Sequence, residues 1–150
     1  MRHVIVMLVL AALANWASAA GDSAAEADVL AAATAFNLAY ETNELDAYFG
    51  HYVPEAELYF YGQRVAVADY YAEWQRFLGA GGAVQEYAMS DVRVRLLTDD
   101  VAISSYFVVN RTRDESGEVA RSEGFETVVW QQIDGRWRVL NLHFTEHGDS

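Results

Sequence analysis

One acidic residue, Glu126, lies within the otherwise largely apolar segment Phe125–Ile133. In a β-strand alternate residues face opposite sides, so Glu126 would share a face with Val128 and Trp130. A carboxyl group among apolar side chains loses hydration, which raises its pKa and suits a general base. Glu126 is therefore the candidate catalytic residue, and a structural pairing of its carboxylate is the alternative interpretation.

Three tyrosines in or near predicted strands, Tyr59, Tyr61 and Tyr106, could present hydroxyl groups to a ligand in a cavity. Tyrosines on strands also pack in cores or interfaces with only the hydroxyl at the rim, and this alternative stays open. The same two interpretations apply to Trp74 and Trp130.

The segment His143–His147 has the pattern H-x-x-E-H, which is typical of zinc peptidases when both histidines lie on one face of a helix. Here the segment continues a predicted strand and no third ligand is evident, so we expect His143 on the outer face of a sheet and no metal or cofactor. The sequence also contains no P-loop, G-x-S-x-G, Rossmann or EF-hand motif, so nucleotide hydrolysis, ester hydrolysis and calcium binding have no support.

Hydrophobic periodicity predicts three helices and five strands that position these residues. The predicted helices are Ser23–Thr42, with Asp22 or Ser23 as N-cap, Leu45–Phe49 and Val65–Leu78; the predicted strands are Glu57–Tyr61, Tyr87–Leu97, Val101–Val109, Phe125–Ile133 and Trp137–Phe144. The turn residues Asp114–Gly117 and Asp134–Gly135 indicate two hairpins. Helices followed by antiparallel strands predict an α+β domain, in which the helices pack in the concave face of a curved, mainly antiparallel sheet and enclose a cavity.

Both faces of the strand Phe125–Ile133 carry apolar residues. Opposite the face of Glu126 lie Phe125, Val129 and Ile133. Helices of the same chain can cover one face of the sheet, so the other face requires a different partner. The simplest partner is a second copy, and we expect a homodimer or a higher oligomer.

The N-terminal residues 1–19 have the features of a signal peptide. Arg2 and His3 precede the apolar run Val4–Ala14, and Ala17–Ala19 forms an A-x-A cleavage site. The alternative, a membrane anchor, is disfavoured because the run falls short of the ~20 residues that span a bilayer. We expect export to the periplasm or secretion, followed by a single domain over residues 20–150. The absence of Cys means that this domain has no disulfide.

The formal net charge of −12 argues against nucleic acid and anionic membrane surfaces as partners, because binding phosphate groups needs a basic patch. After removal of the signal peptide we expect no membrane association.

The order of elements resembles the NTF2-like superfamily, a cone-shaped, cystatin-like fold that includes SnoaL-like proteins and ketosteroid isomerase. Within it, Leu45–Phe144 is most similar to the association (hub) domain of calcium/calmodulin-dependent protein kinase type II. The similarity rests on Asp69–Tyr71, Asp100–Ala102 and above all on Glu126–Trp137, which resembles the family pattern E-T-R-V-W-x-x-x-D-G-x-W. This resemblance implies a self-associating domain.

The resemblance also implies where a ligand pocket would lie. The arginines that hold an anion in hub domains correspond to Val108, Val128 and Phe144, Tyr48 keeps the pocket tyrosine of the family, and Tyr71 replaces a histidine. A pocket built this way would be aromatic and apolar rather than anion-binding.

The proton-transfer residues of ketosteroid isomerase correspond to Phe36 and Phe60, which cannot exchange protons. The sequence therefore predicts an exported, self-associating domain that binds a small apolar or aromatic molecule rather than catalysing a reaction. One alternative is a SnoaL-like isomerase, cyclase or dehydratase that uses Glu126 with a tyrosine as acid–base pair. The other is a purely structural oligomerisation module.

Overall fold

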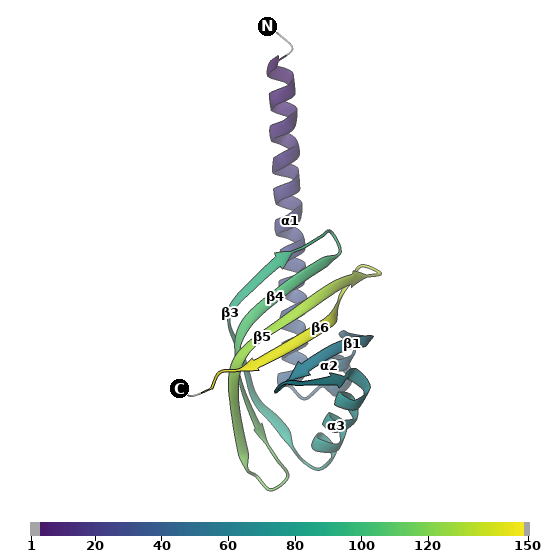
Figure 1. Ribbon diagram of the computed structural model, residues 1–150, viewed down its shortest axis with the longest axis vertical. Coiled ribbons are helices and arrows are strands. Elements are labelled where there is room, and N and C mark those ends of the chain that lie inside the picture. Colours follow the sequence, from purple (N-terminus) through teal and green to yellow (C-terminus); the bar gives the residue numbers. More distant parts are fainter. Residues whose placement is uncertain (1–3, 149–150) are drawn as a thin grey trace.

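The computed structural model describes the backbone of residues 4–148 and the side chains of residues 22–148. Within these residues the chain forms three helices and one six-stranded mixed sheet, in the order β2-β1-β6-β5-β4-β3. The elements are α1 (Val4–Glu41), α2 (Leu45–Phe49), β1 (Tyr52–Phe60), β2 (Gln63–Ala66), α3 (Val67–Gly79), β3 (Ala83–Leu96), β4 (Val101–Arg113), β5 (Val119–Ile133) and β6 (Arg136–Glu146). Figure 1 shows the curved sheet lying across the C-terminal half of α1, with α2 and α3 beside β1. The predicted α+β fold is confirmed.

Helix α1 is longer than predicted. It is continuous from Val4 to Glu41 and does not begin at Asp22 or Ser23. Alanine-rich sequence on both sides of these residues favours the helix, because alanine has the highest helix propensity. Arg2 and His3 of the predicted signal peptide lie outside the described residues, and the described side chains begin at Asp22. In the described part of the chain, no helix has the length and apolar character needed to cross a bilayer.

The end of α1 is fixed by Asn43, which has a positive φ of 61°. Its side chain accepts a hydrogen bond from Val84 N at 2.7 Å and donates one to Val84 O at 3.1 Å, so it joins the end of the helix to β3. Asparagine tolerates this left-handed conformation better than most residues. The predicted helix break is therefore confirmed, as are the predicted bounds of α2.

Most of the predicted bounds differ from those of the structure: β3 begins at Ala83, β4 continues to Arg113, β5 begins at Val119 and α3 begins at Val67. Two further differences concern β1 and β2. Strand β1 begins at Tyr52 and includes Pro54, and its pairing with β6 is irregular between Tyr52 and Glu57. Proline donates no backbone hydrogen bond, which accounts for an irregularity at this point. Strand β2 was not predicted, because Val65 continues the apolar spacing of α3 and was assigned to that helix.

The meander β3–β6 positions the inner residues of the sheet. Strands β4 and β5 pair Tyr106 with Glu126 and Val108 with Gly124, and β5 in turn pairs Glu126 with Phe144 of β6. Gly124 is required where β6 approaches, since a Cβ there would lie 2.1 Å from Thr145 O. The parallel neighbour of β6 on its other side is β1, where Leu58 pairs with Leu142.

The core lies between α1 and the concave face of the sheet. Phe36 of α1 is fully buried and contacts Trp130 of β5 edge-on, with ring centroids 5.8 Å apart. Trp130 Nε1 donates a hydrogen bond to Ser104 Oγ at 2.9 Å, which satisfies the one polar group of this ring. This contact holds α1 against the middle of the sheet.

The outer, convex face of the sheet carries a half-exposed apolar strip in its middle, flanked by ion pairs such as Arg111–Glu86. Phe107 and Phe125 pack edge-on with centroids 5.3 Å apart, and Phe125 is 53% exposed. Ile103 and Val129 are paired beside them on neighbouring strands. The sheet therefore carries apolar residues on both faces, as the sequence predicts.

Candidate functional site

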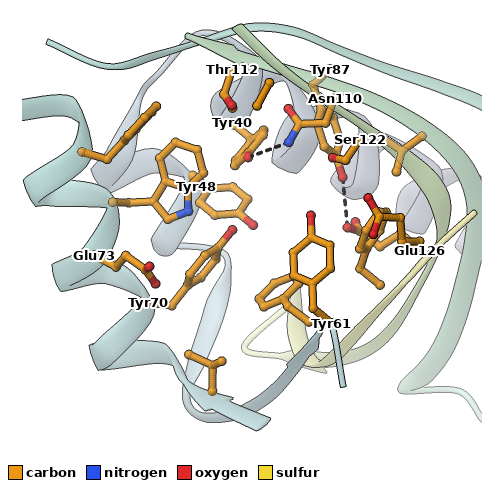
Figure 2. Close-up of a pocket in the computed structure, with 18 of the residues that line it drawn as sticks. Tyr40, Tyr48, Tyr61, Tyr70, Glu73, Tyr87, Asn110, Thr112, Ser122 and Glu126 are labelled. Atoms are coloured by element: carbon orange, nitrogen blue, oxygen red, sulfur yellow. Dashed lines mark hydrogen bonds between the residues drawn. The ribbon is translucent and has the colours of Figure 1, made fainter. Parts of the chain in front are cut away.

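A cavity of about 670 Å³ lies between the helices and the inner face of the sheet. Side chains from all three helices and all six strands line it (Figure 2). They are Tyr40, Tyr48, Phe60, Tyr61, Gln63, Val65, Tyr70, Glu73, Trp74, Phe77, Tyr87, Val108, Asn110, Thr112, Ala120, Arg121, Ser122, Glu126, Phe144 and Glu146.

Aromatic rings form the helical side of the cavity. Tyr40 in the last turn of α1 contacts Tyr48 of α2, with centroids 5.1 Å apart, and Trp74 of α3 at 4.9 Å. Tyr70 and Trp74 are four residues apart on α3 and so lie on the same face of that helix. Figure 2 shows the hydroxyls of Tyr40, Tyr70 and Tyr61 directed toward the middle of the cavity.

Glu126 lies on the sheet side of the cavity and is only 5% exposed. Its carboxylate accepts hydrogen bonds from the hydroxyls of Tyr106 and Tyr87, the latter at 3.0 Å. Burial raises the pKa of Glu126 from 4.5 to about 7, and the two tyrosine hydrogen bonds oppose this rise. The group therefore titrates near neutrality.

The tyrosines around Glu126 act as neutral hydroxyl groups. Burial raises the pKa of Tyr40, Tyr48, Tyr87 and Tyr106 well above the usual value of 10.0, and the nearby carboxylate of Glu126 raises each of them further. Near neutral pH these groups can donate hydrogen bonds but cannot serve as bases.

The far end of the cavity, near the β4–β5 hairpin, is polar. Asn110 donates a hydrogen bond from Nδ2 to the Tyr40 hydroxyl at 3.3 Å. Arg121 also belongs to this end, but it has the strand parity of the outer face, and its guanidinium is paired with Glu123. The cavity thus combines an aromatic wall, one buried carboxyl group and a polar end.

Residues 25–148 match the family described as the calcium/calmodulin dependent protein kinase II association domain. The chain belongs to this family. None of the curated proteins matches the chain significantly.

Solved structures with the same fold include members of this family and other NTF2-like proteins. A Xanthomonas campestris protein assigned to the association-domain family is 22% identical, with 81% of this chain and 87% of that chain covered and a TM-score of 0.67. The association domain of CaMKII from C. elegans is 16% identical, with 83% and 97% covered and a TM-score of 0.65. An NTF2-like protein from Rhodospirillum rubrum is 15% identical, with 81% and 99% covered and a TM-score of 0.72. At these identities the similarity shows the fold alone.

Six of the eleven site residues predicted from the sequence line the cavity. Val108 and Phe144, two of the positions at which the resemblance places arginines, are in its wall and carry no charge. The other four are Tyr48, Tyr61, Trp74 and Glu126. The hydroxyls of Tyr48 and Tyr52 form a hydrogen bond of 2.7 Å, so the Tyr48 hydroxyl already has one partner within the protein.

Two predicted residues lie outside the cavity wall because they face away from it. Tyr59 is on the opposite side of β1 from the cavity, beside His143, and its hydroxyl donates to Glu57 at 2.9 Å. Tyr71 is directed from α3 toward α2, where its hydroxyl donates to Asp46 at 3.0 Å. Neither side chain therefore lines this cavity.

Three further predicted residues are on the inner face of the sheet but beneath the cavity wall. Val128 and Trp130 are completely buried under α1, because the helix crosses the sheet at that point. Tyr106 is 1% exposed and lies beside Glu126 on the neighbouring strand, where its hydroxyl donates a hydrogen bond to the carboxylate. These residues support the site but do not line it.

Sequence reasoning did not identify Tyr40, Tyr70, Tyr87, Glu73 or Asn110 as part of the site. A signal was present for Asn110, since it has the same strand parity as Val108 and continues that face toward the hairpin. Tyr40 and Tyr70 were assigned to the apolar stripes of helices, because the same helical spacing serves both core packing and cavity lining. Tyr87 was predicted only as the first residue of a strand. In the described part of the chain, no three side chains of His, Asp or Glu are arranged to hold a metal ion.

Proposed function

We propose that this chain is an exported, self-associating domain whose cavity binds a small, mainly apolar molecule. The observation that supports binding is the cavity itself. Its volume of about 670 Å³ falls within the range of roughly 300–1,000 Å³ that is usual for small-molecule sites. Aromatic rings dominate one wall and Glu126 supplies a directional polar group on the other.

Self-association is supported by the family and by the convex face of the sheet. Phe125, Ile133 and Val119 of β5 are 53%, 36% and 44% exposed, and apolar surface of this kind is stabilised by contact with a second copy. Sedimentation velocity at micromolar concentration should show a dimer or a larger species. A single monomeric boundary over that range would contradict self-association.

Export is supported by the sequence of residues 1–19, with an apolar run followed by an A-x-A site. The full chain expressed in a bacterium should be recovered from the periplasm or the medium with Ala20 as its first residue. N-terminal sequencing of the purified protein tests this. A product that keeps Met1 and stays in the cytoplasm would contradict export.

Ligand binding can be tested by thermal shift against steroids, polyketides and short carboxylates. The variant Ala120→Trp would place an indole in the cavity, whereas Glu115→Trp would place the same group in the exposed turn between β4 and β5. A ligand of the cavity should raise the melting temperature of the wild type and of Glu115→Trp but not of Ala120→Trp. If no compound raises it for any of the three proteins, the purely structural alternative is favoured.

A second candidate function is acid–base catalysis by Glu126. The supporting observation is that its pKa is raised to about 7 and that the Tyr87 hydroxyl is 3.0 Å from its carboxylate. A general base is most effective when its pKa lies near the operating pH. Turnover of a cavity ligand by isomerisation or dehydration, lost in Glu126→Gln and reduced in Tyr87→Phe, would support catalysis. Turnover that is unchanged in Glu126→Gln would exclude this role.

A further inference from the structure

We propose that the ligand of the cavity is a small organic cation, an amine attached to an apolar body, whose ammonium group binds the carboxylate of Glu126. This inference rests on the proposed binding function and specifies the chemical class of the ligand. Three observations support it: the hydrogen-bond partners of Glu126, the charges of the residues that line the cavity, and the aromatic rings of the helical wall.

Glu126 has no cationic partner among the residues that the structure describes. Its hydrogen-bond donors are the hydroxyls of Tyr87 and Tyr106, one to each carboxylate oxygen. The ion pairs of the described residues all involve other carboxylates. A carboxylate can accept about four hydrogen bonds, so acceptor positions remain on Glu126. An ionised, buried carboxylate without a cation is costly, and a bound ammonium group would remove that cost.

The titratable groups around Glu126 are tyrosines whose pKa values are raised, so they stay neutral near pH 7. They are Tyr40 of α1, Tyr48 of α2, Tyr52 of β1, Tyr70 of α3, Tyr87 of β3 and Tyr106 of β4. The neighbour of Glu126 on β6 is Phe144, which carries no charge. The counter-ion for the carboxylate therefore has to come from the ligand.

The charges that line the cavity favour a cation as well. Glu73, Glu126 and Glu146 supply three carboxyl groups, whereas Arg121 has the strand parity of Val119 and Phe125, which face away from the cavity. Arg121 is already paired with Glu123, so its charge is largely compensated. The chain as a whole carries a formal net charge of −12, which adds to the negative potential. An anionic ligand would be repelled.

The aromatic wall is suited to the same ligand. Cations are attracted to the faces of tyrosine and tryptophan rings, most strongly where water is excluded. Figure 2 shows Tyr70 across the cavity from Glu126, and Tyr70 contacts Trp74, which in turn contacts Tyr40. An amine with an apolar body can therefore bind the carboxylate and contact these rings at the same time.

Three probes of similar size and different charge test the proposal: 1-naphthylmethylamine, 1-naphthylmethanol and 1-naphthoate. Titration calorimetry at pH 8, where Glu126 is mostly ionised and the amine is protonated, should give the wild type at least a tenfold preference for the amine over the alcohol. Naphthoate should bind most weakly. In Glu126→Gln the affinity for the amine should fall on the order of 30-fold, while that for the alcohol stays unchanged. The control Glu115→Gln removes the same charge from an exposed turn and should keep the preference.

The pH dependence of the wild type provides a test that needs no variant. Because Glu126 has a pKa of about 7, lowering the pH from 8 to 6 should weaken amine binding by about tenfold and leave the alcohol unaffected. Equal affinities for amine and alcohol, or tighter binding of naphthoate, would overturn the proposal and leave the binding function standing. Failure of all three probes to bind the wild type would overturn both.

Discussion

Tyr106 and Glu126 face each other on neighbouring strands and share a hydrogen bond, because they are direct partners in the β4–β5 register. The Tyr106 hydroxyl is also 3.4 Å from Asn37 Oδ1 of α1. A tyrosine has one hydroxyl proton, so it can donate to the ionised carboxylate or to Asn37, but not to both at once. The orientation of this hydroxyl is therefore linked to the protonation state of Glu126.

Removal of the Tyr106 hydroxyl should raise the pKa of Glu126 further above 7. The hydrogen bond from Tyr106 stabilises the charged carboxylate and lowers this pKa, so Tyr106→Phe removes an effect that opposes burial. Titration of the Glu126 carboxyl carbon by NMR measures the change. Tyr59→Phe, which removes a hydroxyl bound to Glu57 on the other side of β1, is the control and should leave this pKa unchanged. A lower pKa of Glu126 in Tyr106→Phe would show that this hydrogen bond does not stabilise the ionised carboxylate.

The stability of the domain should depend on pH through Glu126. Burial raises the pKa of Glu126 from 4.5 to about 7, so the folded state keeps a proton that the unfolded chain releases. This stabilising contribution is fully present below about pH 4.5 and is lost as the pH rises through 7. The difference in free energy of unfolding between Glu126→Gln and the wild type should therefore change by on the order of 3 kcal/mol in favour of Glu126→Gln when the pH is raised from 4.5 to 8.

Urea unfolding of both proteins at the two pH values tests this prediction, since groups other than Glu126 contribute equally to each and cancel in the difference. Glu115→Gln, an exposed change of the same kind, should show no such gain. A difference between Glu126→Gln and the wild type that does not vary with pH would show that Glu126 is not held in its neutral form.

A charge on the convex face should prevent self-association. Phe125 packs on Phe107 and remains 53% exposed in the single chain, so Phe125→Glu would bury a carboxylate in any interface formed there. The sedimentation coefficient should fall to that of a monomer. Leu97→Glu places a charge at a residue that is equally exposed but follows β3 in a turn, and it should still assemble. Assembly of Phe125→Glu with unchanged affinity would place the interface elsewhere.

A methyl group at Gly124 should destabilise the sheet. The added Cβ would lie 2.1 Å from Thr145 O and 2.9 Å from the Glu146 Cα, and both are backbone atoms that cannot move without displacing β6. We expect Gly124→Ala to lower the free energy of unfolding by roughly 1–3 kcal/mol, measured by urea denaturation. At Gly79 an added Cβ meets nothing within 4 Å, so Gly79→Ala should be neutral or slightly stabilising. Equal stabilities of the two variants would contradict the close approach.

The meander could be predicted from the sequence because its signals are local. Asp134–Gly135 forms the turn between β5 and β6, and alternation in β5 places Glu126 on the inner face. The parallel pairing of β1 with β6 was not predicted, since no local pattern states which distant strand lies beside Leu58. Strand β2 was missed for a related reason, because Val65 fits helical spacing as well as a strand.

The site was predicted only in part, for a comparable reason. Strand parity is sufficient to place Val108 and Glu126 on the inner face, but not to show how far along that face the helix covers it. Trp130 and Val128 have the same parity as Glu126 and are nevertheless sealed beneath Phe36 and its neighbours on α1. The boundary between core and cavity depends on which part of the sheet α1 covers before it ends at Asn43. That depends on how the helix packs on the sheet, which the local sequence pattern does not specify.

The parallel pair β1–β6 has a consequence for the order of folding. It joins strands from early and late parts of the domain, so a long loop must close before these backbone hydrogen bonds can form. Hairpins such as β5–β6 close much shorter loops and can form earlier. We therefore expect Phe60 and Tyr61 to reach their final positions last, and the hollow between sheet and helices to be absent from early folding intermediates.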